Sequence, residues 1–557
     1  VFFPIVFMDG MTGRLFREFS IVVSGSVIIS SFAALTFTPM LATKLLVKQE
    51  KKNWFYMKTE PFFEGMNRIY SRSLEIFLHK RWLAMPLILA TLIIIVFLWN
   101  AIPAEMAPLE DRSQISINTR GAEGVTYEYI RDYTEDINQL VDSILPDAES
   151  VTARVSSGSG NVRITLKDMK DRDYTQMEVA EQISKAVQKK TKARSFVQQS
   201  SSFGGRRGGM PVQYVLQATN IEKLQEVLPV FMAKVYENPV FQMADVNLKF
   251  SKPEARININ RDKASIMGVS TRNIAQTLQY GLSGQRMGYF YMNGKQYEIL
   301  GEINRQQRNK PADLKGIYIR SDKGDMVQLD NLIELTNGIA PPKLYRYNRF
   351  VSATISAGLA DGKTIGQGLD EMDKIAKETL DDTFRTALTG DSKEYRESSS
   401  SLMFAFILAI LLIYLILAAQ FESFKDPLII MLTVPLAIAG ALVFMYFGGI
   451  TMNIFSQIGI IMLIGLVAKN GILIVEFANQ KQETGEDKMQ AIKDAALQRL
   501  RPILMTSAST VLGLIPLAFA TGEGCNQRIA MGTAVVGGML VSTLLTMYIV
   551  PAIYSYV

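Results

Sequence analysis

Long apolar blocks alternate with polar connections along this chain of 557 residues, and one long polar stretch, residues 101–400, interrupts them. A helix needs about 20 mainly apolar residues to cross the hydrocarbon core of a bilayer. Seven blocks meet this requirement in full, and they are residues 19–42, 82–100, 401–420, 427–449, 453–478, 502–520 and 529–555. Residues 1–8 have the pattern of the last part of an eighth block. The sequence therefore predicts a membrane bundle of α-helices.

The polar stretch has the periodicities of an α+β fold. Residues 114–119 alternate like a strand, whereas residues 126–145 repeat their apolar positions with helical spacing. Strands at 150–155 and 162–167 and a helix at 176–190 follow. This order is the core of a ferredoxin-like βαβ module.

A second module of the same kind is split by an insert. Its predicted elements are a strand at 212–218, a helix at 221–236, strands at 244–250 and 254–260, and, after the insert, a strand at 351–357 and a helix at 365–380. The Gly- and Ser-rich segment 200–209 is expected to form a flexible link between the two modules.

The distribution of Lys and Arg sets the expected orientation in the membrane. The formal net charge is +6, and two connections are rich in these residues, with nine in 43–81 and five in 479–501. Since cytoplasmic loops are enriched in Lys and Arg, both connections are expected inside the cell and residues 101–400 outside. Residues 62–78 mix aromatic and basic positions at helical spacing, which predicts an amphipathic helix on the inner surface.

Composition excludes several kinds of site. One cysteine, Cys525, cannot form an internal disulfide framework, and one histidine, His79, argues against a His-based metal centre or catalytic dyad. Neither a GxxxxGK[ST] phosphate loop nor an HExxH motif occurs. Most of the 27 methionines lie in apolar blocks as ordinary packing residues. We expect no ATP-driven motor in this chain, no enzyme, no bound metal and no nucleic-acid partner.

Two ionisable residues, Lys469 and Glu476, lie inside the apolar block 453–478. Charges at membrane depth are costly and commonly mark ion pathways. Lys469 is near mid-block and needs an acidic partner, but no full span of this chain has a carboxylate near its centre. Because the chain also opens inside an apolar segment without an initiator Met, we expect a longer protein that holds the partner. A purely structural ion pair is the alternative for Lys469, and Glu476 fits a boundary carboxylate.

Other residues of the blocks have more than one interpretation. Arg499 and Thr506 are seven residues apart, and Pro502 between them suits a first helical turn. Arg501 fits an anchor at the helix end, and Thr506 fits a packing hydroxyl. Prolines inside blocks predict kinks, and glycines of the last block predict close helix contacts; these are Pro39, Pro86, Pro435 and Pro516, and Gly532, Gly537 and Gly538.

Five stretches of the sequence are highly specific. They are residues 13–19 (GRLFREF), 35–41 (LTFTPML), 419–424 (AQFESF), 468–478 (AKNGILIVEFA) and 500–507 (LRPILMTS). Together they resemble the resistance-nodulation-division (RND) efflux pumps of the hydrophobe/amphiphile branch, and the resemblance covers essentially the whole chain.

The resemblance implies the inner-membrane permease of a tripartite efflux complex. Such a permease is a multi-pass homotrimer with twelve transmembrane helices per subunit, and it works with a periplasmic adaptor and an outer-membrane channel. It is a proton antiporter without a cofactor, and it confers multidrug resistance by exporting small amphiphilic or xenobiotic compounds. A heavy-metal RND pump and an RND-type lipid transporter or protein-export auxiliary are the alternatives.

The resemblance also gives a role to each segment. The expected division is 1–42, the end of one transmembrane helix and a following one; 43–81, a cytoplasmic amphipathic connection; 82–100, a transmembrane helix; 101–264, periplasmic porter modules; 265–340, a docking insert; 341–400, the remainder of the second porter module; and 401–557, five transmembrane helices.

The resemblance assigns roles to three intramembrane residues. Lys469 matches the family's relay lysine, and Arg499 and Thr506 match its two relay positions on helix eleven. The acidic pair that completes the relay belongs to helix four, which this chain is not expected to hold.

The expected substrate pocket departs from the family pattern. Pumps for aromatic drugs commonly have Phe on the strands that line their deep pocket. The matching stretch, residues 151–167, has no Phe and only a short loop. The candidate pocket residues are therefore Thr152, Arg154, Gly158 and Arg163.

Overall fold

The computed structural model describes residues 6, 10–45, 54–199, 210–339, 343–360 and 362–556. The chain forms two compact units. The first comprises residues 1–120, 128–247 and 346–557, and the second comprises residues 121–127 and 248–345.

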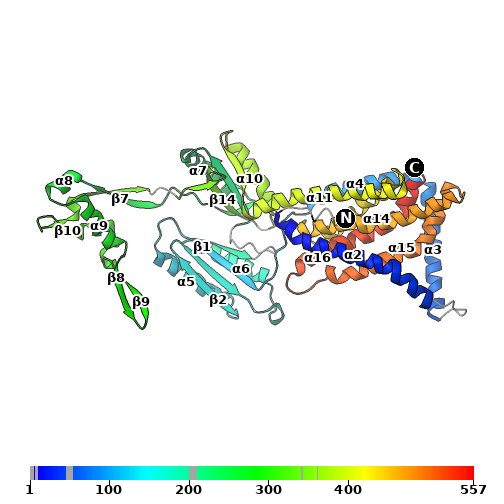
Figure 1. The fold of residues 1–557 in the computed structure, drawn as a ribbon, viewed down its shortest axis with the longest axis horizontal. Coiled ribbons are helices and arrows are strands. Elements are labelled where there is room, and N and C mark those ends of the chain that lie inside the picture. Colours follow the sequence, from blue (N-terminus) through cyan, green and yellow to red (C-terminus); the bar gives the residue numbers. More distant parts are fainter. Residues whose placement is uncertain are drawn as a thin grey trace. The chain divides into compact units, whose positions relative to one another are not determined.

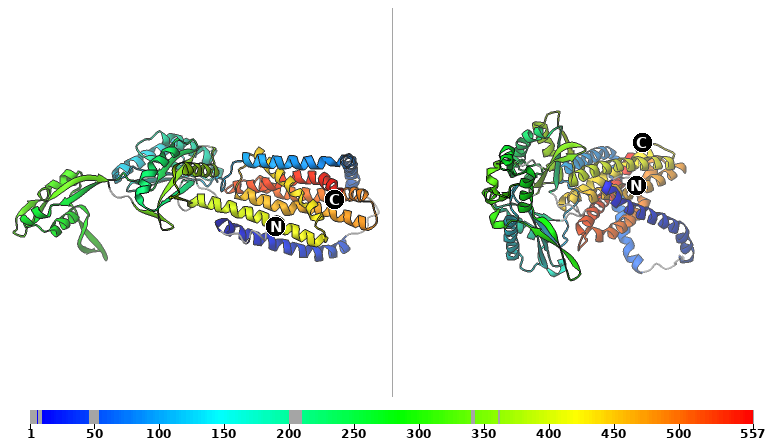
Figure 2. Two further views of the ribbon diagram at one scale, coloured as in Figure 1. Left: turned by 90° about the horizontal axis from the view of Figure 1, so that it is seen from above. Right: turned by 60° about the vertical axis from the view of Figure 1, so that its left-hand side comes forward.

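Seven helical segments of the described part are long and apolar enough to cross a membrane, which confirms the predicted bundle. They are Phe16–Leu45 of α2 (Gly10–Leu45), Arg81–Ala101 (η1, Arg81–Leu83, and α4, Ala84–Ala101), Gly390–Phe421 (α11), Asp426–Phe447 (α12 and α13), Ile454–Glu483 (α14), Lys488–Ala518 (α15) and Cys525–Tyr554 (α16). Figure 1 and the left view of Figure 2 show these helices running lengthwise next to one another. Of the predicted partial span at 1–8, only Val6 lies among the described residues.

The fourth span is broken at Leu432 into α12 (Asp426–Met431) and α13 (Thr433–Phe447). Pro435 explains the break. A proline inside a helix lacks an N–H, and its ring clashes with the carbonyl group four residues earlier, which here belongs to Met431. The kink predicted at Pro435 thus coincides with a break of one residue, at which Leu432 keeps helical backbone angles.

Helix α16 packs against α13, α14 and α15 at very short range. A Cβ atom built on Gly532 would lie 2.5 Å from the backbone nitrogen of Ala518 in α15. Gly537 and Gly538 have equally little room against the side chains of Phe444 and Leu463. The close helix contacts predicted for these three glycines are confirmed.

Helix α3 (Trp54–His79) contains the helix predicted at 62–78 and runs across the ends of the long helices (Figure 1). Its residues Tyr70, Leu74 and Leu78 recur every fourth position and are buried against the bundle. The Tyr70 hydroxyl donates to the carbonyl oxygen of Met547 in α16 at 2.6 Å. Its position on the inner surface of a membrane stays a prediction.

The first α+β module has the predicted ferredoxin-like order and one further strand. Its elements are β1 (Gln114–Arg120), α5 (Tyr127–Ile144), β2 (Ser150–Ser156), β3 (Ser159–Thr165), α6 (Gln176–Gln188) and β4 (Arg194–Gln199). The strands form one antiparallel sheet in the order β2-β3-β1-β4. Apolar side chains of alternate strand positions pack with α5 and α6 into one core, so both helices cover the same face.

The second module is completed from both sides of the insert. Its elements are β5 (Val212–Ala218), α7 (Ile221–Glu237), β6 (Phe241–Val246), β14 (Phe350–Leu359), α10 (Ile365–Thr379) and β15 (Arg385–Leu388). Strand β14 pairs with β5 and β6, and β15 pairs with the other edge of β5. The short strand β13 (Tyr345–Tyr347) adds to the edge of β14.

The second compact unit is built around a two-stranded ladder. Strand β7 (Pro253–Ile259) pairs with β12 (Ile333–Ile339), so the strand predicted at 254–260 belongs to the insert and not to the second module. The insert is thus wider than the expected 265–340. The other elements are α8 (Arg261–Ile266), α9 (Thr271–Leu282), the hairpin β8 (Gln285–Met292) and β9 (Lys295–Gly301), and the pair β10 (Tyr318–Arg320) and β11 (Met326–Gln328).

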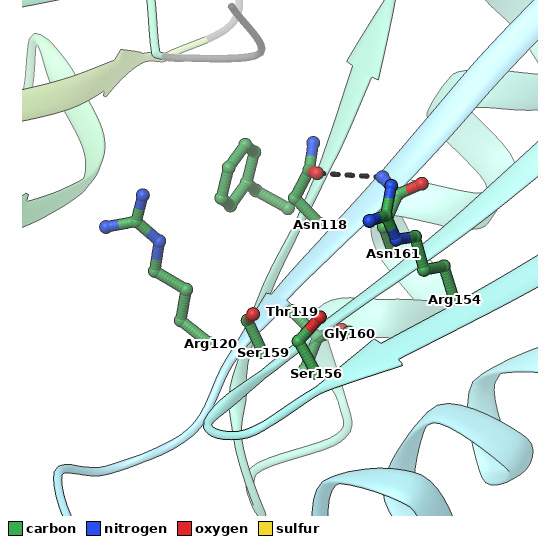
Figure 3. Close-up of a pocket in the computed structure, with 9 residues that line it drawn as sticks. Asn118, Thr119, Arg120, Arg154, Ser156, Ser159, Gly160 and Asn161 are labelled. Atoms are coloured by element: carbon green, nitrogen blue, oxygen red, sulfur yellow. Dashed lines mark hydrogen bonds between the residues drawn. The ribbon is translucent and has the colours of Figure 1, made fainter. Parts of the chain in front are cut away.

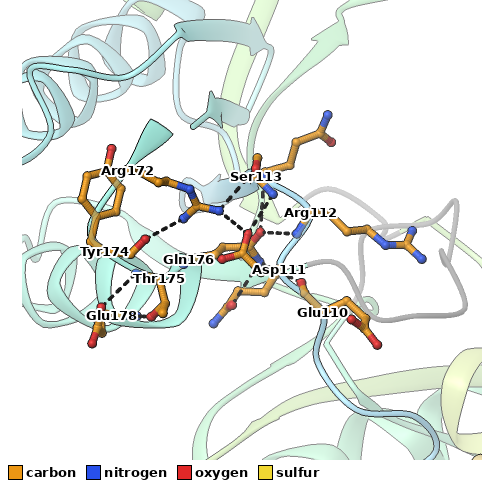
Figure 4. A network of polar contacts seen from close by, with 11 residues as sticks. Glu110, Asp111, Arg112, Ser113, Arg172, Tyr174, Thr175, Gln176 and Glu178 are labelled. Atoms are coloured by element: carbon orange, nitrogen blue, oxygen red, sulfur yellow. Dashed lines mark hydrogen bonds and ion pairs between the residues drawn. The ribbon is translucent and has the colours of Figure 1, made fainter. Parts of the chain in front are cut away.

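Glu110 and Asp111, just before β1, make polar contacts with two helices, and the contacts of Asp111 within the first module are drawn in Figure 4. Asp111 forms an ion pair with Arg172, whose side chain is fully buried, and accepts a hydrogen bond from the backbone N–H of Gln176, the first residue of α6. The adjacent Glu110 accepts one from the backbone N–H of Gln527, in the first turn of α16, at 3.0 Å. Two consecutive carboxylates therefore hold two different helix starts.

Candidate functional sites

A buried polar cluster connects three membrane helices at the depth of the intramembrane charge. Asn470 of α14 donates hydrogen bonds to Ser507 of α15 and Thr543 of α16, each at 3.3 Å. Thr543 in turn donates to Ser507 at 3.2 Å. All three side chains are buried. In an apolar surrounding such interhelical bonds satisfy groups that water cannot reach, so the cluster fixes the three helices relative to one another.

Lys469 precedes Asn470 but points away from this cluster. Successive side chains of a helix differ by about 100° in direction, so the two residues cannot face the same neighbours. Asn470 is buried, whereas Lys469 is exposed on the outside of the bundle. In the part of the chain that the structure describes, the Lys469 ammonium has no ion pair.

Thr506 and Arg499 lie on α15 at different distances from the cluster. Thr506 directly precedes Ser507, and its hydroxyl donates to the carbonyl oxygen of Ile503 at 3.1 Å. The Arg499 guanidinium lies over the ring of Phe477 in α14, 4.6 Å from its centroid, and its Nε is buried without a hydrogen-bond partner among the described residues. Lys469 and Thr506 thus flank the contact of Asn470 with Ser507, whereas Arg499 lies nearly two turns away.

The sheet of the first module exposes a polar face on the side opposite α5 and α6. Strand alternation directs every second residue to it. We use the name open face for the three rows of this face that run across all four strands, and their twelve residues are Ser116, Asn118, Arg120, Thr152, Arg154, Ser156, Ser159, Asn161, Arg163, Arg194, Phe196 and Gln198. Three predicted pocket residues, Thr152, Arg154 and Arg163, are therefore on one face.

A pocket of about 200 Å³ lies on the open face near the β2–β3 turn (Figure 3). Its lining residues are Asn118, Thr119, Arg120, Arg154, Ser156, Ser159, Gly160, Asn161 and Phe196. Of the predicted pocket residues only Arg154 is among them. Gly158 is in the two-residue turn between β2 and β3, where its φ of +80° favours glycine.

The pocket places two arginines on either side of an amide pair (Figure 3). Asn161 donates to the side-chain oxygen of Asn118 at 2.8 Å, and Asn118 donates to Gln198 at 3.0 Å. Figure 3 shows Arg120 and Arg154 on opposite sides of Asn118. The amides are therefore held by one another, while the guanidinium groups border the pocket.

Beneath the open face, the core holds a buried phenol. The Tyr133 hydroxyl accepts a hydrogen bond from Ser195 at 3.2 Å. Burial raises the pKa of Tyr133, an effect that the Ser195 hydroxyl partly offsets. The phenol stays neutral at physiological pH and supports the sheet from the helix side.

The sequence profile of the AcrB/AcrD/AcrF family matches the chain from residue 1 to residue 557. The chain belongs to the AcrB/AcrD/AcrF family. The resemblance to RND permeases that the five motifs indicated is thereby confirmed. This member of the AcrB/AcrD/AcrF family has, in its described part, seven helical segments that are long and apolar enough to cross a membrane.

A protein of Haemophilus influenzae (strain ATCC 51907 / DSM 11121 / KW20 / Rd), named only as an uncharacterized transporter, is 31% identical to the chain over 573 residues. The alignment covers 100% of the chain and 55% of that relative. The chain thus spans about half the length of this relative.

In this AcrB/AcrD/AcrF family member, sequence reasoning missed the residues that complete both sites. Asn470 and Ser507 directly follow the predicted relay residues Lys469 and Thr506. Each is a polar residue inside an apolar block, which was a signal that could have identified it. Thr543 is also a polar residue inside an apolar block, but it follows no predicted relay residue, and nothing in its own block shows which helices it contacts. Phe196 was missed because strand β4 was not predicted.

Proposed function

We propose that this chain is part of a proton-driven antiporter of the bacterial inner membrane that exports amphiphilic or xenobiotic compounds. Lys469 carries the proposal. It is a cation within a membrane span of a transporter family member, and it is exposed on the outside of the described bundle without an ion pair. A charge at this depth requires a carboxylate or water. We assign the carboxylate to a part of the transporter beyond this chain, in keeping with the greater length of the relative.

The coupling step follows from the charges. While the acidic partner is ionised, charge-assisted hydrogen bonds hold the Lys469 ammonium. A proton from outside the cell neutralises the partner and releases the ammonium, which changes the preferred position of α14. Because Asn470 ties α14 to Ser507 and Thr543, the shift is passed to α15 and α16. Thr506 and Arg499 then provide a hydroxyl and a second cation along α15 toward the cytoplasm.

The same proposal includes topology and partners. Residues 101–400 lie in the periplasm, whereas 43–81 and 479–501 lie in the cytoplasm. Permeases of this family generally form trimers and work with an adaptor and an outer-membrane channel. We assign this transporter the same assembly, and we assign the unit around residues 248–345 to the contact with the outer-membrane channel.

Replacing the intramembrane cation tests the proposal. In the full-length transporter, Lys469→Ala is expected to abolish proton-coupled efflux while the trimer still assembles. Efflux is measured in proteoliposomes with an imposed pH gradient, and assembly is measured by cross-linking. Lys493→Ala is the matched control, because that ammonium is near the end of the bundle and pairs with Glu75 of α3 at 3.0 Å. Normal efflux by the Lys469→Ala variant would exclude the relay role.

A further inference from the structure

The open face of the first module has an unusual balance of charge. Its twelve residues include four arginines, Arg120, Arg154, Arg163 and Arg194, and no Asp or Glu. The side chains of Arg120 and Arg194 are 55% and 59% exposed. Four cations on one small sheet create a strongly positive surface that attracts anions.

Asp245 of the second module forms ion pairs with the arginines of β1 and β4 on this face. Asp245 of β6 lies 3.1 Å from the guanidinium of Arg120 and 3.6 Å from that of Arg194. Its side chain is 7% exposed, so this carboxylate is already occupied. Asp245 therefore accounts for the arginines of β1 and β4 and not for those of β2 and β3.

Arg154 and Arg163 are the arginines without a protein partner. Arg154 is opposite Asn161, and Arg163 is opposite Thr152, so the two are diagonal neighbours on adjacent strands. Diagonal neighbours lie within reach of a common ligand when their side chains are long. Neither guanidinium has an ion pair in the described parts of the chain. Two adjacent like charges without a counterion favour binding of an external anion.

The other edge of the same face offers an apolar contact. Phe196 of β4 is opposite Asn118, in the same cross-strand row as Arg154. Three interstrand steps of about 4.8 Å separate β2 from β4, so the cation and the ring are about 14 Å apart across the sheet. The amides of Asn161 and Asn118 lie between them and are already hydrogen-bonded. This arrangement fits a molecule with an anionic end and an aromatic body.

We propose that the open face binds organic anions with an aromatic or aliphatic body, and that such amphiphilic anions are the preferred substrates of this transporter. The carboxylate, sulfonate or phosphate group pairs with the guanidinium groups of Arg154 and Arg163, whose forked N–H donors match such groups. The apolar body lies along the amides and contacts Phe196. This inference rests on the proposed efflux function for its transport step and on the open face alone for binding.

The test uses three probes that share one fluorescent aromatic body and carry a carboxylate, a neutral amide or a primary amine. Binding to the purified full-length transporter is measured by equilibrium dialysis, and transport is measured in proteoliposomes. The test variants are Arg154→Gln with Arg163→Gln, and Arg154→Glu. The control is Arg131→Gln, because Arg131 is also an exposed arginine of the same module, on helix α5.

The wild type is expected to bind and transport the carboxylate at least about tenfold better than the amide, as one charge-assisted hydrogen bond predicts. The double Gln variant is expected to lose this preference while its binding and transport of the amide stay unchanged. Arg154→Glu is expected to shift the preference toward the amine, and Arg131→Gln is expected to behave as the wild type. Equal binding of carboxylate and amide by the wild type overturns the inference. The inference is also overturned if the double variant binds all three probes more weakly by the same factor, since the arginines then support the fold or contact another part of the protein. Binding preference without proton-coupled transport supports the anion site and contradicts the proposed antiport.

Discussion

At the scale of single residues, local environment decides what each charged group contributes. Arg172 is fully buried beside Asp111, and Asp245 of β6 is buried between Arg120 and Arg194. These carboxylates therefore form ion pairs that stabilise the packing of neighbouring elements. Arg154 and Lys469 have comparable charges without such partners in the described chain. The difference separates the ion pairs of the fold from the charged groups on which the two proposals rest.

Glu105 provides a test of pH dependence at this scale. It follows α4, and its carboxylate accepts a hydrogen bond from Thr451 in the connection between α13 and α14. Burial raises the pKa of Glu105, and the Thr451 hydroxyl only partly offsets the effect. The native state therefore binds this proton more tightly than the unfolded state, so stability is lost as pH rises from the ordinary pKa of Glu, about 4.3, through the raised value.

We expect Glu105→Gln to raise the melting temperature of the full-length protein at neutral pH and to have no such effect below about pH 4, where both carboxyl states are protonated. The amide oxygen of Gln still accepts the bond from Thr451. Thermal unfolding between pH 4 and pH 8 measures the difference, with the exposed Glu149→Gln as control. A gain in stability that is the same at every pH would show that the effect is not ionisation.

At the scale of elements, the sequence pattern predicted helices and strands whose formation depends on one segment of the chain. It did not predict contacts that form between two segments far apart in the sequence. Each membrane span is recognisable because about 20 apolar residues are sufficient evidence for it. Strand β7 could not be assigned to the insert, because its pairing with β12 joins two segments far apart in the sequence and no local pattern indicates it. The cluster of Asn470, Ser507 and Thr543 was hidden for the same reason, since each residue belongs to a different span.

Close packing of α16 gives a prediction for one element pair. Gly532→Ala would place a methyl group against the backbone of Ala518, which cannot rotate away as a side chain can. We expect the substitution to destabilise the protein by about 1–3 kcal/mol, the usual cost of overpacking. Melting temperature in detergent measures the loss. Gly65→Ala in α3 is the control, because a Cβ there meets no atom within 4 Å, and equal stabilities of the two variants would contradict the packing argument.

At the scale of the whole molecule, the distribution of Lys and Arg predicts the orientation in the membrane. The basic connections predict that residues 479–501 face the cytoplasm and that the first module faces the periplasm. Asp168, next to the sheet of that module, and Thr484, at the end of α14, are both exposed.

We expect an impermeant thiol reagent added to intact cells to label Asp168→Cys and to leave Thr484→Cys unlabelled until the cells are opened. Both variants are made in a Cys525→Ser background, so that the natural thiol does not react. Labelling of Thr484→Cys but not of Asp168→Cys in intact cells would reverse the topology.

The adjacent residues Glu110 and Asp111 link the start of α16 to the start of α6 through two hydrogen bonds. Consecutive Cα atoms are about 3.8 Å apart, so the link contains almost no slack. A displacement by one helical turn, about 5.4 Å, exceeds what the link can stretch, so it must either carry the start of α6 along or break the bond at Glu110.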